Sequence, residues 1–89
     1  MQRKEKVTKV IDGDTFETNR RKHSVRLANV DTPEKRQPGY QDAKKELSDL
    51  ILNKEVTIDT VARDKYGRSV AKVKVGVQSV NKKMEKHQK

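Results

Sequence analysis

Acidic side chains gather at two turns of an otherwise basic chain. Asp12 and Asp14 flank a glycine, and Asp31 and Glu34 flank a Thr-Pro pair. Like charges held close together repel unless a cation lies between them, and hard oxygen ligands suit Ca²⁺ or Mg²⁺ better than zinc. Asp-Gly-Asp is also a common turn sequence, and residues 31–34 read equally as a capped loop. The acids alone therefore leave a cation site and an ordinary pair of turns both open.

Two arginines near these acids point to phosphate chemistry. Arg26 interrupts the apolar stretch Val25–Val30, and Arg68 follows the Tyr66-Gly67 turn. A guanidinium fork binds two phosphate oxygens at once. The plainer alternative is that Arg26 only neutralises the neighbouring acids or faces solvent. Two arginines, paired carboxylates and a spare glutamate are together the groups needed for metal-assisted phosphodiester hydrolysis.

Short strands and one helix must position these groups. Period-two patterns predict strands over residues 7–11, 14–18, 23–30, 55–62 and 69–75, and apolar residues at helical spacing predict a helix over 40–52. Three strands, a helix and two strands are the order of an OB-fold, a five-stranded Greek-key barrel. We therefore predict a mainly β protein with one or two helices, in the order β-β-β-α-β-β.

Composition limits the size of the protein and the kind of partner. The 89 residues are 30% hydrophobic and 39% charged, with a net charge of +9. This predicts a single domain over residues 1–89, with 1–6 and 82–89 as flexible flanks. The chain has no cysteine, which excludes disulfides, cysteine-bound zinc and thiol catalysis. The positive charge favours a polyanionic partner.

The distribution of apolar residues along the sequence shows neither a membrane-spanning helix nor a signal peptide. No apolar run approaches the roughly 18 residues of a membrane-spanning helix, so we expect no membrane partner. The charged residues 1–6 lead into a strand pattern without the apolar segment of a signal peptide. The expected location is cytoplasmic as written, or secreted or in the cell envelope if a signal peptide was removed.

Three blocks in a fixed order make the chain similar to the staphylococcal nuclease (thermonuclease) family. They are Ile11–Thr15, then Val25–Leu27 with Val30–Glu34, and finally Asp64–Arg68. One block alone is a weak signal, whereas all three in this order, with a helix between the second and third, are highly specific. The resemblance implies an OB-fold and a Ca²⁺-dependent endonuclease that acts on DNA and RNA and leaves 3′-phosphates.

The resemblance also implies a cation site. Asp14 and Asp31 would be the carboxylate ligands of Ca²⁺, and the backbone carbonyl of Thr32 would be a further ligand. Mg²⁺ and Mn²⁺ stay open as alternatives to Ca²⁺. Glu34 would orient or deprotonate the attacking water.

The remaining roles that the resemblance implies concern phosphate groups. Arg26 and Arg68 would stabilise the charge that builds on the pentacovalent phosphate. Lys65 and Tyr66 would hold a neighbouring phosphate of the substrate.

The chain is short at its C-terminal side compared with this family, which continues through further helical structure after the position of Asn81. We therefore expect that a homodimer is one way to cover that side of the barrel. Two alternatives to an enzyme stay open: a non-catalytic OB-fold module that binds nucleic acid, and a truncated, inactive nuclease fold. The retained acidic residues and arginines argue against the first alternative.

Overall fold

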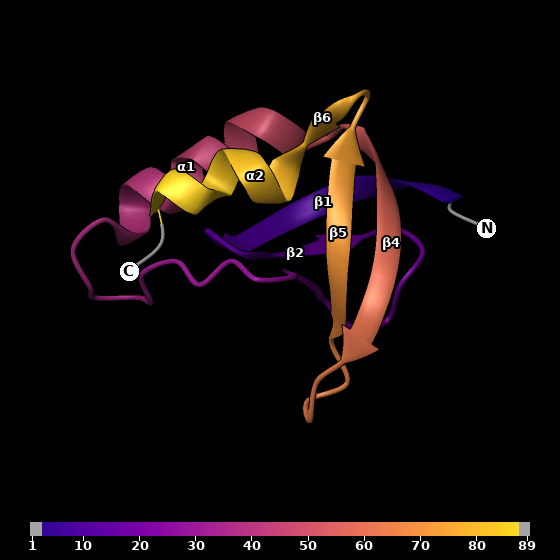
Figure 1. The fold of residues 1–89 in the computed structure, drawn as a ribbon, viewed down its shortest axis with the longest axis horizontal. Coiled ribbons are helices and arrows are strands. Elements are labelled where there is room, and N and C mark those ends of the chain that lie inside the picture. The colour runs from indigo at the N-terminus through magenta and orange to yellow at the C-terminus, as the bar shows by residue number, and fades with distance from the viewer. Residues whose placement is uncertain (1–2, 88–89) are drawn as a thin grey trace.

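Six strands and three helical segments make up the fold that the computed structural model describes for residues 3–87 (Figure 1). The elements are β1 (Arg3–Asp12), β2 (Thr15–Thr18), β3 (Val25–Leu27), α1 (Tyr40–Ile51), β4 (Glu55–Arg63), β5 (Ser69–Val75), β6 (Gln78–Ser79), α2 (Val80–Met84) and the 3₁₀ helix η1 (Glu85–His87). The predicted order β-β-β-α-β-β is confirmed, and β6, α2 and η1 follow it. Sequence patterning missed β6 because two residues are too few to show a period.

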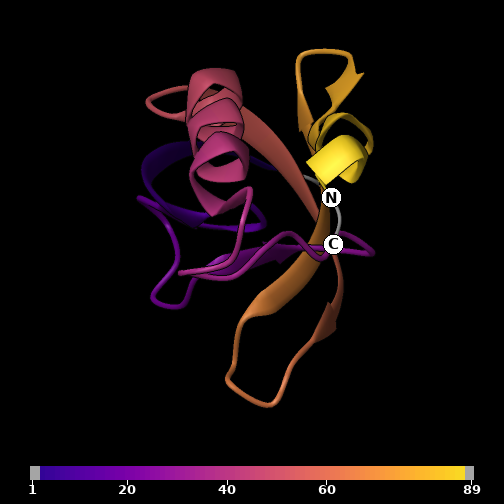
Figure 2. The ribbon, with the colours of Figure 1, turned by 90° about the vertical axis from the view of Figure 1, so that its left-hand side faces the viewer.

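The sheet closes on itself through its third strand. The strands lie in the order β3-β2-β1-β4-β5-β6, and β3 also pairs in parallel with β5, with Arg26 opposite Val70. This closure confirms the predicted OB-fold barrel, and it pairs the edge of β3 that would otherwise be open. Figure 2 shows α1 and α2 at one end of the ring and the turn between β4 and β5 at the other.

One apolar core fills the barrel and the space beneath the helices. Phe16 is fully buried, and Ala43, Leu47 and Ile51 form the buried stripe of α1. Tyr40 begins that stripe but is only half-buried, and its hydroxyl donates a 3.2 Å hydrogen bond to the carbonyl of Ile11. The helix therefore packs on the barrel through its aliphatic residues and ties to β1 through the phenol.

Two turns with left-handed backbone set the element boundaries. The third strand is shorter than the predicted 23–30, because Asn29 has a φ of 61° and turns the chain away after Leu27. Asn53, directly after the predicted helix 40–52, has a φ of 63°, a left-handed conformation that is common just past the end of a helix. Asparagine tolerates this conformation better than the aliphatic residue that a strand would carry at position 29.

Regular structure reaches into both segments that were expected to be flexible flanks. Residues Arg3–Lys6 extend β1, where they pair with Glu55–Ile58 of β4. At the other end, α2 and η1 extend over residues 82–87 of the second flank, and Met84 is buried there. The structure of both segments depends on contacts with residues far away in sequence. Local charge density was therefore a poor guide to the extent of regular structure there. Residues 1–2 and 88–89, which belong to the same predicted flanks, lie outside the described residues.

A buried asparagine fastens α2 to the barrel. The Asn81 side chain accepts a hydrogen bond from the N–H of Val73 at 2.8 Å, and it donates to the carbonyls of Ala28 at 2.9 Å and Ala71 at 3.0 Å. We expect Asn81→Ala to lower the free energy of unfolding by about 3 kcal/mol, since each buried polar group left unpaired costs about 1 kcal/mol or more. Urea unfolding measures this loss. Gln78→Ala, at an exposed position, is the control, and equal stability of the two variants would contradict the role of Asn81.

Surface features of the described residues bear on membranes and on self-association. Within residues 3–87, no helix is long and apolar enough to span a membrane. The large apolar side chains that are exposed there, Val61, Tyr66 and Val77, lie on three different segments. They do not support the expected homodimer, which stays a prediction.

Candidate active site

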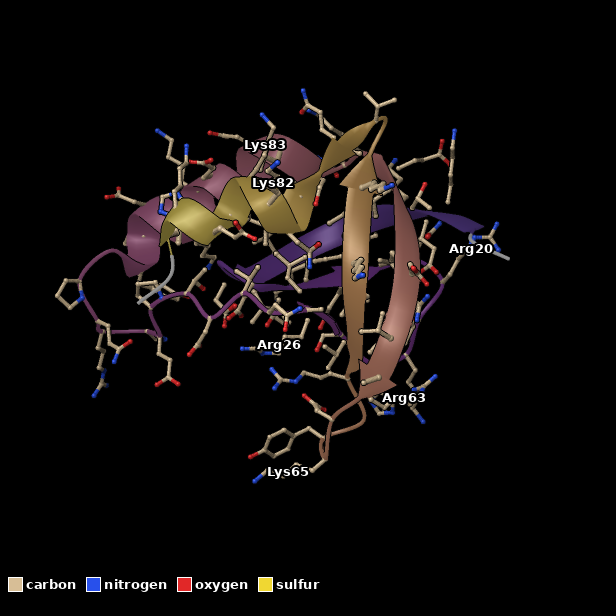
Figure 3. All side chains as sticks on the ribbon, in the orientation of Figure 1. Arg20, Arg26, Arg63, Lys65, Lys82 and Lys83 are labelled. Atoms are coloured by element: carbon tan, nitrogen blue, oxygen red, sulfur yellow. The ribbon has the colours of Figure 1, made fainter. Side chains whose placement is uncertain are left out.

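A polar cavity of about 200 Å³ lies where the β1–β2 turn, β3, the loop after β3 and the start of β5 meet. Its lining consists of Asp12, Asp14, Arg26, Asp31, Thr32, Pro33, Glu34 and Arg68. Six of the eight residues predicted for the site therefore share one cavity. The other two, Lys65 and Tyr66, lie outside its lining, on the turn between β4 and β5. Figure 3 shows Lys65 at the tip of this turn and Arg26 beside the same end of β5.

Asp14 is the fixed point of the cavity. Its side chain is almost buried; one carboxylate oxygen accepts a 2.9 Å hydrogen bond from the Thr15 hydroxyl, and the other accepts a 3.2 Å bond from the N–H of Thr32. The second bond joins the β1–β2 turn to the loop after β3. The carboxylate is thus held in one orientation by two groups of buried residues, one a side-chain hydroxyl and the other a backbone N–H.

Gly13 permits this close approach of the turn, the loop and α1. A Cβ atom at position 13 would lie 2.6 Å from Cβ of Ala43 and 2.7 Å from Oγ1 of Thr32. Real Cβ atoms do not approach other atoms so closely, so any larger residue would push α1 or the loop away. The glycine in Asp-Gly-Asp is therefore needed for close packing.

Arg26 lies between the two acidic segments. Its Nη2 is 3.5 Å from Oδ2 of Asp14 and 3.7 Å from Oδ1 of Asp31, and its Nη1 donates to the carbonyl of Leu27 at 3.2 Å. Arg26 therefore pairs with the acids, as the plainer interpretation of the sequence allowed. It also lines the cavity, so the same guanidinium is within reach of an anion bound there.

Asp64 positions the second arginine. Its Oδ2 lies 2.6 Å from Nε of Arg68, and its Oδ1 accepts the backbone N–H groups of Tyr66 and Arg68 at 3.0 Å each. Desolvation acts to raise the pKa of Asp64, but the bonds from Arg68 outweigh it and hold this pKa below its usual value. Sequence reasoning gave Asp64 no role, although an acid four residues before an arginine, across a glycine turn, is a readable signal.

Lys65 and Tyr66 sit next to Arg68 on the same turn. Tyr66 is 67% exposed, and its ring centroid lies 5.3 Å from Nζ of Lys65 and 5.5 Å from Cζ of Arg68. Both distances are those of cation–π contacts. The two predicted phosphate-binding residues therefore form an exposed rim beside the cavity.

Asp12 is a member of the cavity that the predicted set lacked. Its Oδ1 accepts a 3.1 Å hydrogen bond from the N–H of Asp14. Burial, together with the nearby Asp14 carboxyl, raises the pKa of Asp12 to about 6. The Asp-Gly-Asp spacing was the available signal, because it places the first acid where it can cap the turn that carries the second.

The donor set of the cavity fits a hard cation. Asp14 and Asp31 supply carboxylate oxygens, and Oγ1 of Thr32 is buried without a hydrogen-bond partner among the described residues. Within residues 3–87, no group of three or more histidine, cysteine, aspartate or glutamate side chains is arranged to hold a metal ion. A cation here would therefore depend on two carboxylates with backbone and water oxygens, which is a ligand set that Ca²⁺ and Mg²⁺ accept.

Acidic oxygens and two positioned guanidiniums share one cavity on the wall of an OB-fold barrel, and this combination defines a class of small barrel protein with a polar, charged cleft. Comparison with protein families agrees with this class. Residues 24–87 match the family described as staphylococcal nuclease homologues. The chain belongs to the staphylococcal nuclease family.

Individual relatives carry nuclease names. An uncharacterized endonuclease of Haemophilus influenzae is 39% identical over 84 residues, which are 91% of this chain and 47% of that protein. A micrococcal nuclease of Shigella flexneri is 38% identical over 69 residues, or 75% of this chain and 40% of that protein. A thermonuclease of Staphylococcus hyicus is 36% identical over 91 residues, or 91% of this chain and 54% of that protein. The chain thus spans about half the length of these relatives.

Proposed function

We propose that this protein is a Ca²⁺-dependent endonuclease that hydrolyses phosphodiester bonds of DNA and RNA and leaves 3′-phosphates. The observation that carries the proposal is the shared cavity of Asp14, Asp31, Glu34, Arg26 and Arg68. It combines oxygen ligands for a cation with donors for a phosphate. The nuclease names of the relatives support the same activity.

The two arginines bind the scissile phosphate. Asp64 holds Arg68 through Nε, so the terminal nitrogens of that guanidinium extend toward the substrate. Arg26 donates from β3, the strand that pairs with β5, where Asp14 and Asp31 hold it. Donors fixed before the reaction stabilise the transition-state charge without reorganising, and each is worth about 3–4 kcal/mol.

Glu34 acts on the water that attacks the phosphate. Its carboxylate accepts the proton that the water loses, or orients that water for attack on phosphorus, and the P–O bond to the 5′ oxygen breaks. A bound Ca²⁺, held by Asp14, Asp31 and the carbonyl of Thr32, would neutralise negative charge on the phosphate. Lys65 and Tyr66, on the exposed rim, contact a neighbouring phosphate of the substrate.

Cleavage assays with and without divalent cations test this proposal. We expect plasmid DNA, single-stranded DNA and RNA to be cut with Ca²⁺ and left intact with a chelator, and parallel reactions with Mg²⁺ and Mn²⁺ define the metal. The products should accept label directly from polynucleotide kinase, since cleavage at the 5′ P–O bond leaves a free 5′-hydroxyl. Salt-sensitive gel shifts without cleavage would instead show a binding module. Neither cleavage nor binding would show an inactive fold.

A further inference from the structure

A second hollow, of about 270 Å³, lies outside the candidate active site. Its lining is Arg20, Arg21, Lys22, His23, Arg63 and Ser69, and it shares no lining residue with the acidic cavity. No aspartate or glutamate lines it. Within residues 3–87, Lys22 and Arg63 take part in no ion pair, and both side chains are exposed. The hollow is therefore a concentrated region of uncompensated positive charge.

A buried acid outside the lining holds Arg21, which is one of the lining residues, in place. Arg21 binds both oxygens of Glu5 through Nε, at 2.9 and 3.0 Å, and it donates from Nη1 to Oγ of Ser69 at 2.9 Å. Glu5 is only 5% exposed, and its negative charge is compensated below the surface by the ion pair with Arg21. This arrangement fixes the hollow in shape, and it leaves the cations at its rim unopposed.

The hollow adjoins the candidate active site through β5 and the turn before it. Arg63 pairs with Ser69 across β4 and β5, and Ser69 directly follows Arg68. Asp64, the residue after Arg63, binds the Arg68 guanidinium. Figure 3 shows Arg26 and Arg63 on opposite sides of the same end of β5. A flexible polyanion bound in the cavity needs to extend only around this end of the barrel to meet the second hollow.

We propose that this basic hollow binds backbone phosphates of the nucleic-acid strand on one side of the scissile bond. The inference rests on the proposed nuclease function and adds a substrate-binding subsite to it. Guanidinium and ammonium groups recognise phosphate oxygens, and counterion release supplies the affinity. The lining has no Phe, Tyr or Trp on which a base would stack, so the contacts are to the backbone. Contacts to phosphates carry no sequence information, so binding here is independent of base sequence.

Fluorescence anisotropy tests the subsite without cleavage. It measures the binding of a labelled 20-nucleotide single strand in the presence of a chelator. The test variant is Lys22→Gln with Arg63→Gln, and the control is Lys82→Gln with Lys83→Gln, which removes the same charge from exposed positions on α2 at the other end of the molecule. We expect the test variant to bind about tenfold more weakly at 0.1 M salt, with the slope of log K against log salt reduced by about 1.4. Equal losses in the two double variants would overturn the proposal, because general charge would then explain both.

Steady-state kinetics separate this subsite from the proposed function. With Ca²⁺, we expect the test variant to show a raised KM for the 20-nucleotide strand and an unchanged KM for a dinucleotide, which is too short to reach the hollow. An equal rise for both substrates would overturn the subsite. If the wild-type protein cleaves neither substrate, the proposed function fails, while the anisotropy comparison still decides whether the hollow binds nucleic acid. Thermal unfolding of both double variants verifies that the fold is retained.

Discussion

Replacing Arg68 by lysine is expected to lower kcat for DNA cleavage by roughly a hundredfold to a thousandfold, with KM changed less than about threefold. Lysine keeps the positive charge, so general attraction of the substrate is retained. It lacks the planar fork, and its single ammonium group would be drawn to Asp64, which lies 2.6 Å from Nε of Arg68 in the wild-type protein. The lost interaction therefore belongs to the transition state, where two phosphate oxygens must be contacted at once.

Arg36→Lys is the matched control for this prediction. Arg36 is exposed, lies on the loop after β3 and does not line the cavity, so the same change there should leave kcat and KM unaltered. Full steady-state curves for the wild type and both variants separate kcat from KM. A wild-type rate for Arg68→Lys would show that charge alone is needed at this position, and the proposed phosphate contact would be wrong.

The acidic cavity was predictable from the sequence because its residues are carried by short, recognisable turns. Asp14 follows a tight Asp-Gly turn, and Asp31 and Glu34 belong to a loop that a proline marks as irregular. The barrel topology then brings these turns together. The sequence indicated the order of strands and a specific set of motifs. The contact between the turns depends on the antiparallel pairing of β2 with β3, and the pairing of β3 with β5 brings Arg68 to the same place.

Other features were beyond sequence reasoning for physical reasons. Asn29 ends β3 through a left-handed backbone, and a single polar residue does not reveal its φ. Glu5 looked like part of a solvated flank, yet it is buried because Arg21, 16 positions later, binds it. Long-range ion pairs of this kind leave no periodic signal. For the same reason, the basic turn around Arg21 read only as a break between strands.

The division of charge between the two sites has a functional consequence. The acidic cavity pairs Arg26 with carboxylates, and its lining combines acids with two arginines, which suits the proposed binding of a phosphate together with a cation. The second hollow has no acid in its lining and is suited to retaining a polyanion at any base sequence. The net charge of +9 is thus distributed unevenly, and the acids are concentrated where hydrolysis is proposed.

Asp14→Asn is expected to abolish Ca²⁺ binding and to lower the cleavage rate by roughly a thousandfold, since loss of the cation removes several kcal/mol of charge stabilisation. The amide oxygen can still accept the hydrogen bond from the N–H of Thr32, and the amide nitrogen can donate to the Thr15 hydroxyl. The turn therefore keeps its geometry while the negative charge disappears. The variant thus tests the carboxylate as a cation ligand separately from its structural bonds.

Calorimetric titration and thermal unfolding measure this effect independently of catalysis. At a Ca²⁺ concentration of 100 times Kd, the wild-type protein should gain about 2.7 kcal/mol of stability, and Asp14→Asn should gain none. Asp12→Asn is the control, because its amide oxygen retains the 3.1 Å bond from the N–H of Asp14, and we expect its Ca²⁺ affinity to change by only a few fold. If Asp12→Asn instead lost Ca²⁺ and Asp14→Asn retained it, the ligand would be the first acid of the turn. The cation would then lie on the Asp12 side of the cavity, away from the Thr32 carbonyl that is proposed to complete its ligand set.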